Sequence, residues 1–60
     1  MTQSYIETPR GDFRLGFETL EAAEAEGWGL WFYHYNDDGT VTAIVAKNNQ
    51  AVAVSENITF

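Results

Sequence analysis

Residues 30–55, LWFYHYNDDGTVTAIVAKNNQAVAVS, decide the fold of this 60-residue chain. Within it, residues 40–47 (TVTAIVAK) are rich in the β-branched side chains that favour strands. The NDDG segment at 36–39 is a typical hairpin turn, with its glycine in the left-handed conformation. The Asn-Asn pair at 48–49 suits a two-residue type I′ turn, because asparagine tolerates positive φ. The stretch therefore predicts an antiparallel meander of strands at 30–35, 40–47 and 51–55.

These two turns predict the register of the meander, and the register predicts its two faces. We expect Tyr35 opposite Val41, Tyr33 opposite Ala43, Trp31 opposite Val45, Val45 beside Val52, and Ala43 beside Val54. The bulkier face then carries Trp31, Tyr33, Tyr35, Val41, Ala43, Val45, Val52 and Val54. The other face has small residues in its middle and carries Leu30, Phe32, His34, Ile44, Ala46, Ala51 and Ala53. We expect a helix to pack on this second face, and the bulkier face to be covered either by the N-terminal strands or by a partner.

The first part of the chain predicts two further strands. Residues 3–8 form a short candidate strand, and the Pro-Arg-Gly-Asp segment at 9–12 is a turn signal. Phe13, Leu15 and Phe17 then alternate with Arg14 and Gly16, which is the periodicity of a strand.

A helix is predicted from Phe17 or Glu18 to Glu26, where alanines and glutamates predominate. Thr19 or Gly16 would cap its N-terminus, and Gly27 suits the position after its C-terminus. The element order is therefore β-β-α-β-β-β. We expect a single acidic α+β domain over residues 1–60, with one helix packed on an antiparallel sheet of three to five strands.

The charge balance limits the partners of this protein. Nine acidic residues against three basic ones give a net charge of −6, which repels nucleic acids and anionic membranes and attracts basic surfaces. The chain has no cysteine, so disulfides and thiolate metal sites are excluded. We find no secretion signal at the N-terminus and no apolar run near the ~20 residues that span a bilayer, and we expect a cytoplasmic protein.

The glutamates of the predicted helix are the strongest candidates for a binding site. Glu18, Glu21 and Glu24 are surface neighbours, and each like-charge pair costs about 0.2–0.5 kcal/mol. Glu24 and Glu26 also lie at the helix C-terminus, where the dipole disfavours anions by about 0.3–1 kcal/mol each. A basic groove in a partner would recover this cost, whereas the alternative is a merely solvated acidic face. The predicted partner-binding residues are Glu18, Glu21, Glu24, Glu26, Asp37 and Asp38, with Glu7, Asp12, Trp31, Tyr33 and Tyr35 as additional candidates.

Motifs for catalysis are absent from the sequence. We find no P-loop, GxGxxG, HExxH or GxSxG pattern. A calcium loop beginning at Asn36 would need a glutamate where Lys47 stands. We therefore expect no catalytic, cofactor-binding or metal-binding residue, and no enzymatic activity.

In size, charge and the acidic residues of its helix and of the 37–38 turn, the chain resembles small acidic phage-encoded inhibitors that mimic DNA, notably anti-CRISPR and anti-restriction proteins. The resemblance implies an inhibitor that binds a basic DNA-binding protein in the host cytoplasm and so evades immunity. Its target would be a type I CRISPR surveillance complex, at the Lys/Arg groove where DNA and its PAM are recognised. The alternative is a small structural or oligomerisation module that uses the aromatic face of Trp31, Tyr33 and Tyr35. The protein would accordingly be a monomer or a homodimer.

Overall fold

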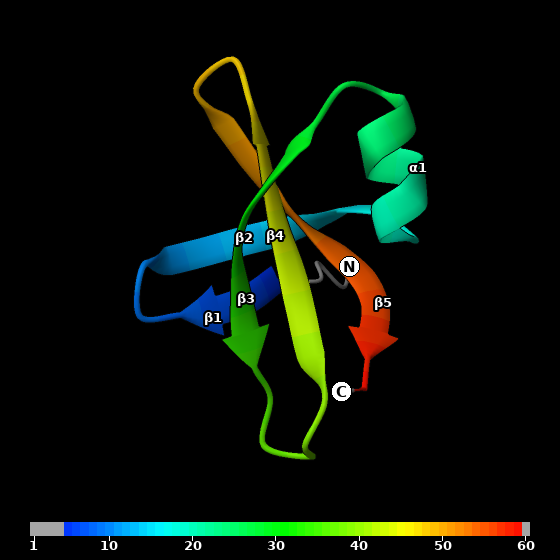
Figure 1. Cartoon of the computed structure of the whole chain (residues 1–60). Coiled ribbons are helices and arrows are strands. Elements are labelled where there is room, and N and C mark those ends of the chain that lie inside the picture. Colours follow the sequence, from blue (N-terminus) through cyan, green and yellow to red (C-terminus); the bar gives the residue numbers. More distant parts are fainter. Residues whose placement is uncertain (1–4, 60) are drawn as a thin grey trace, which may run out of the picture.

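The structure is a computed structural model that describes residues 5–59. One short helix lies beside a curled five-stranded sheet (Figure 1), which confirms the predicted α+β class and element order. The elements are β1 (Tyr5–Thr8), β2 (Gly11–Phe17), α1 (Leu20–Ala25), β3 (Gly29–Tyr35), β4 (Val41–Lys47) and β5 (Gln50–Ile58). Within the described residues, no helix has the length and apolar character needed to cross a membrane.

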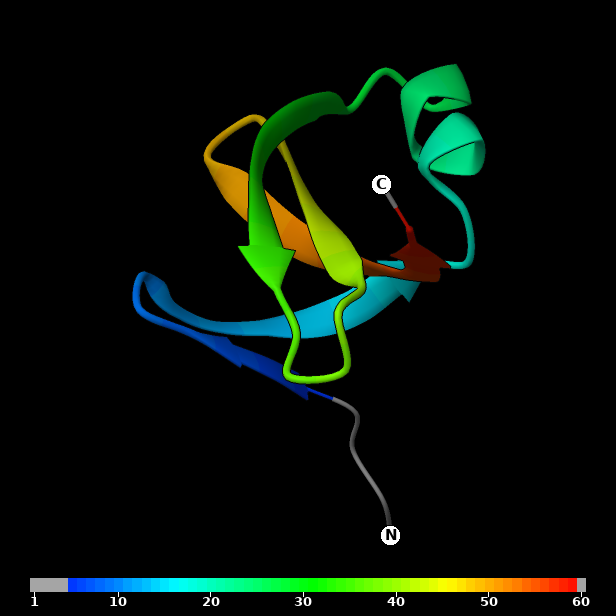
Figure 2. The same ribbon diagram turned by 60° about the horizontal axis from the view of Figure 1, so that its bottom comes forward.

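The strand order in the sheet is β1-β2-β5-β4-β3. Three of the four strand pairs are antiparallel as expected, but β2 runs parallel to β5, so the sheet is mixed. Such a parallel pair needs a long connection, which α1, β3 and β4 supply here. Figure 2 shows the result, in which the β1–β2 hairpin passes across one side of the β3–β4–β5 meander.

The meander itself follows the local sequence. Asn48 and Asn49 have φ values of 52° and 66°, as a type I′ turn requires, and Gly39 has a φ of 89°. The predicted pairs Tyr35–Val41, Tyr33–Ala43 and Val45–Val52 are all present. The turn residues therefore set the register close to each turn.

The register changes farther from the turns, and here the prediction was wrong. A shift between Leu30 and Phe32 places Leu30, instead of Trp31, opposite Val45. A second shift, between Thr42 and Ile44, interrupts the β4–β5 ladder where Ala43 was expected beside Val54. Such irregularities insert residues without altering the apolar composition, so simple alternation does not reveal them.

The helix packs on the face opposite to the predicted one. Ala23 of α1 is fully buried in a core formed with Ala43, Val45, Val52 and Val54. These last four residues belong to the bulkier face, so α1 covers that face. Partly buried side chains packed against the same core include Phe17, Leu20 and Trp28. The face of Ile44 is covered instead by the β1–β2 hairpin, whose Phe13 ring meets the ring of Phe32. All residues from Val41 to Val45 are consequently buried, because β4 has a cover on both sides.

The caps of α1 agree with the sequence, although the helix is shorter than predicted. The Oγ1 atom of Thr19 accepts a hydrogen bond from the Ala22 amide at 3.1 Å, which makes Thr19 the N-cap. Gly27 follows the helix with a φ of 90°. Phe17 ends β2, and Glu18 lies in the connection before α1.

Candidate protein-binding surfaces

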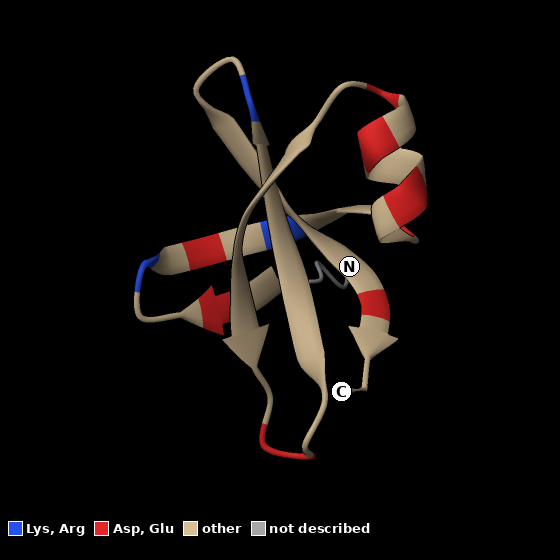
Figure 3. Ribbon diagram, viewed as in Figure 1, with Lys and Arg blue, Asp and Glu red and all other residues tan. Residues whose placement is uncertain are grey.

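The acidic residues around α1 form one surface, which we call the acidic end. Glu21 and Glu24 belong to the helix, and Glu18 and Glu26 flank it in the sequence. Figure 3 shows acidic residues along α1 and at its ends. Glu56 of β5 joins them, because its Oε1 atom accepts a hydrogen bond from the Leu20 amide at 3.4 Å. The acidic end therefore consists of the exposed residues Glu18, Glu21, Glu24, Glu26 and Glu56.

Glu56 of the acidic end is not among the partner-binding residues predicted from the sequence. It is separated from α1 by 36 positions in the chain, and only the parallel β2–β5 pairing brings it to the helix N-terminus. A carboxylate is favourable at this position, because the helix dipole places partial positive charge there. The Ser55 hydroxyl strengthens the same junction by donating to the Glu18 carbonyl oxygen at 3.4 Å.

Lys47 offsets part of the cost of the acidic helix C-terminus. Its Nζ atom donates a hydrogen bond to the Glu26 carbonyl oxygen at 2.8 Å. The last turn of α1 has no basic residue of its own, so the compensating cation comes from β4. Because Lys47 binds a main-chain oxygen in this contact, the contact does not occupy the Glu26 carboxylate.

The other predicted acidic residues lie apart from the acidic end. Asp37 and Asp38 occupy the β3–β4 turn, and Glu7 opposes Asp12 in the β1–β2 hairpin. Figure 3 shows these three acidic regions on separate parts of the molecule. The structure therefore does not gather the predicted carboxylates into one continuous ridge.

Asp38 has a structural role within its turn. Its Oδ1 atom accepts hydrogen bonds from the Thr40 hydroxyl at 2.6 Å and from the Thr40 amide at 3.0 Å. These bonds from Thr40, the hydroxyl first, hold the pKa of the Asp38 carboxyl below its ordinary value. The carboxylate thus helps to close the hairpin whether or not it also meets a partner.

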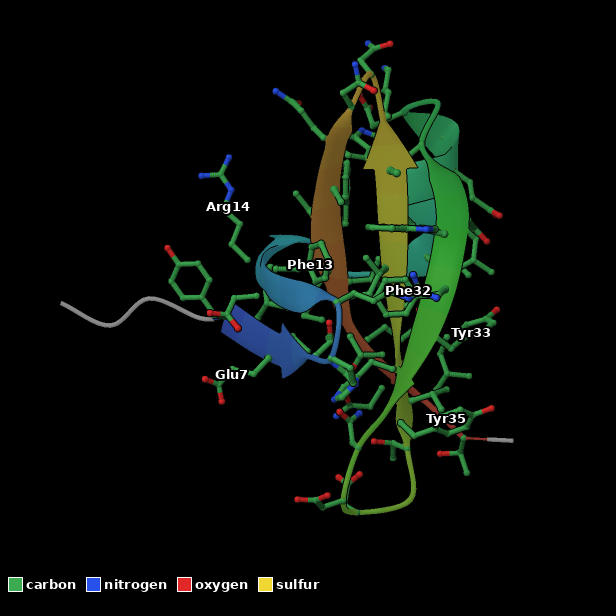
Figure 4. All side chains as sticks on the ribbon, turned by 90° about the vertical axis from the view of Figure 1, so that its left-hand side faces the viewer. Glu7, Phe13, Arg14, Phe32, Tyr33 and Tyr35 are labelled. Carbon is green, nitrogen blue, oxygen red and sulfur yellow. The ribbon has the colours of Figure 1, made fainter. Side chains whose placement is uncertain are left out.

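The predicted aromatic face does not exist as a single surface. Tyr33 packs against the core beneath α1, and Tyr35 is 73% exposed. Figure 4 shows Tyr33 and Tyr35 on one side of β3, with Phe32 and Phe13 on the other. The register shift next to Trp31 places its ring against those of Phe13 and Phe32, at centroid distances of 5.8 and 5.1 Å.

A groove separates the β1–β2 turn from the C-terminal half of β3. Its volume is about 330 Å³, and its lining residues are Pro9, Arg10, Phe32, Tyr33, His34 and Tyr35. The guanidinium of Arg10 lies 5.2 Å from the centroid of the Phe32 ring and 5.9 Å from that of Trp31. These cation–π contacts hold the turn over the aromatic side of β3. The sequence predicts residues 9–12 only as a turn, and no local pattern indicates this contact.

Comparison with known proteins identified no relative of this chain. No protein-family model, curated protein or solved structure matches the chain. Within residues 5–59, no group of three or more His, Cys, Asp or Glu side chains has the arrangement to hold a metal ion. The candidate binding sites of the described residues are therefore the surfaces and the groove described above.

Proposed function

We propose that this protein is an inhibitor that binds a basic nucleic-acid-binding protein through its acidic end. The observation that supports the proposal is the convergence of exposed carboxylates from two distant segments, the region of α1 and Glu56 of β5. Mutual repulsion of these groups lowers the stability of the isolated protein, and a partner rich in lysine and arginine would relieve it.

The size of the acidic end suggests mimicry of a short piece of DNA. A helix of six residues, the length of α1, is about 9 Å long. Duplex DNA carries one negative charge per ~1.7 Å, so the same length of duplex holds about five charges. The acidic end has five carboxylates, those of Glu18, Glu21, Glu24, Glu26 and Glu56, of which only Glu21 and Glu24 lie within α1, so its charge corresponds to a short piece of duplex. A short DNA element such as a PAM is therefore a better match than a long duplex.

We accordingly propose an anti-CRISPR function in the cytoplasm of a phage-infected host. The partner would be the PAM-reading groove of a type I surveillance complex, and inhibition would follow from exclusion of target DNA. Under this proposal, the acidic residues of the β1–β2 hairpin and of the β3–β4 turn contribute through the long-range field and make no direct contact.

The test is binding to a purified type I surveillance complex, with and without target duplex, at low and high salt. We expect binding that duplex displaces and that salt weakens steeply. The double variant Glu21→Lys/Glu24→Lys should lose more than about 100-fold in affinity, which corresponds to about 1.4 kcal/mol for each reversed charge.

A matched control separates the acidic end from overall charge. The variant Glu7→Lys/Asp37→Lys changes the net charge by the same amount at exposed positions away from α1. It should bind much more tightly than the α1 variant. Equal losses in the two variants, or no binding by the parent protein at low salt, would contradict the proposal.

A further inference from the structure

The groove between the β1–β2 turn and β3 collects side chains of the types that dominate protein interfaces. Tryptophan, tyrosine and arginine are the residues in which binding energy most often concentrates. Arg10 and Tyr35 line this groove, and the Trp31 ring contacts the Arg10 guanidinium. Tyr35 is 73% exposed and Trp31 is 49% exposed, so both side chains keep apolar surface that a partner could bury.

The Arg10 guanidinium is held in position, but its hydrogen-bonding capacity is unused within residues 5–59. Its cation–π contacts with the rings of Phe32 and Trp31 fix where the group lies. These contacts engage the charge of the guanidinium, whereas its N–H groups form a planar fork that matches the two oxygens of a carboxylate. Among the described residues, no oxygen atom binds this fork. Because Arg10 is exposed, a carboxylate can reach it from solvent.

The lining of the groove differs in charge from most of the surface. Its described lining residues include the guanidinium of Arg10 and the imidazole of His34 but no carboxylate. The acidic residues nearest to them in the sequence, which lie outside this lining, are Glu7, Asp12, Asp37 and Asp38. Glu7, on the same hairpin as Arg10, points away from β3 (Figure 4). The groove is therefore a local site for an anion in a protein whose net charge is −6.

We propose that this groove binds an extended segment of a partner protein in which one or two acidic residues stand beside apolar ones. The Arg10 fork receives a carboxylate, and the rings of Phe32 and Tyr35 pack against the apolar neighbours. The groove has a volume of about 330 Å³ and exposed borders, whereas a small-molecule site buries most of its ligand. The net charge limits how acidic the segment can be, because the protein as a whole repels a strongly negative chain.

The groove and the acidic end are separate sites with opposite preferences. The acidic end surrounds α1, whereas the groove is formed by the β1–β2 turn and the C-terminal half of β3. An acidic segment is repelled by the acidic end, so charge directs it to the groove, and a basic segment is directed to the acidic end. The binding site in the groove is thus independent of the inhibitor function proposed above.

The experiment selects short random peptides by display on the folded parent protein and on two variants. We expect the parent to enrich peptides with one or two acidic residues next to aromatic or aliphatic ones. Basic peptides bound by the acidic end are counted separately. Arg10→Gln should lose the acidic class. Arg14→Gln makes the same change in net charge on the same hairpin, outside the groove lining, and should keep that class.

A synthetic peptide of the acidic class gives the quantitative test by calorimetry. Arg10→Gln should weaken its binding about 10-fold or more, and so should replacement of the peptide's acidic residue by the corresponding amide. Tyr35→Ala should also weaken binding, and because Tyr35 is exposed this variant keeps the core intact. Circular dichroism would verify that each variant is folded.

NMR chemical shifts of the parent protein locate the bound peptide without any substitution. The largest changes should fall on the residues that line the groove. Failure of the parent to enrich any acidic class would overturn the proposal. Survival of that class in Arg10→Gln, or shift changes centred outside the groove, would overturn it as well.

Discussion

The acidic end and the β3 edge are opposite kinds of surface within one small domain. The acidic end gathers carboxylates from the region of α1 and from β5, whereas the seven residues of β3 include no Asp, Glu, Lys or Arg. The net charge of −6 is therefore distributed unevenly over the surface. Salt should weaken binding at the acidic end, because salt screens the attraction between its carboxylates and a basic partner.

The largest effect on stability is expected from Gly16→Ala, which would disturb the β2–β5 junction that positions the acidic end. A Cβ atom at Gly16 would lie 2.8 Å from the Cβ atom of Val52, which is buried at the core. Overpacking of this kind costs about 1–3 kcal/mol. We expect a decrease of that size in the free energy of unfolding, measured by chemical denaturation.

Gly29→Ala is the matched control, because a Cβ atom there meets nothing within 4 Å. It lies at the start of β3 and should leave the stability nearly unchanged. If Gly16→Ala were as stable as Gly29→Ala, the close packing of β2 against β5 would be disproved.

A smaller effect on stability is expected from Lys47→Met, which would also make the region of the acidic end more negative relative to β3. The substitution removes the cation that binds the Glu26 carbonyl oxygen and should destabilise the protein by about 0.3–1 kcal/mol. The acidic end becomes more negative, so affinity for a basic partner at low salt should rise. Arg14→Met makes the same change in net charge away from this contact and should raise the affinity less. Equal gains would show that only the total charge matters.

The smallest effect concerns the turn at the end of β3. Thr40→Val removes the hydroxyl that donates to Asp38, so the pKa of the Asp38 carboxyl should rise towards its ordinary value. A lowered carboxyl pKa stabilises the fold at neutral pH, and this contribution disappears as the pH falls through the folded-state pKa. Titration of Asp38 followed by NMR would measure the change. Thr40→Ser keeps a hydroxyl and should keep the low pKa, and a rise in that variant too would argue against this cause.

Local features of the sequence predicted a large part of the fold. The Asn48–Asn49 turn, the Thr19 cap and the strand character of β4 depend on the backbone preferences of a few adjacent residues. The acidic character of α1 was equally readable, because neighbours on a helix follow from its periodicity. Register near each turn was correct for the same reason.

Tertiary structure alone decided which surfaces these elements form. The side of the sheet that α1 covers depends on the parallel pairing of β2 with β5, and no local pattern encodes a contact between such distant segments. That pairing brings Glu56 to the helix, and packing from β4 brings Lys47 to its C-terminus. The register shift beside Trp31 likewise divided the predicted aromatic face. Backbone preferences and the neighbours on a helix depend on a few adjacent residues, so the sequence reveals them. The meeting of distant segments follows instead from how the whole core packs.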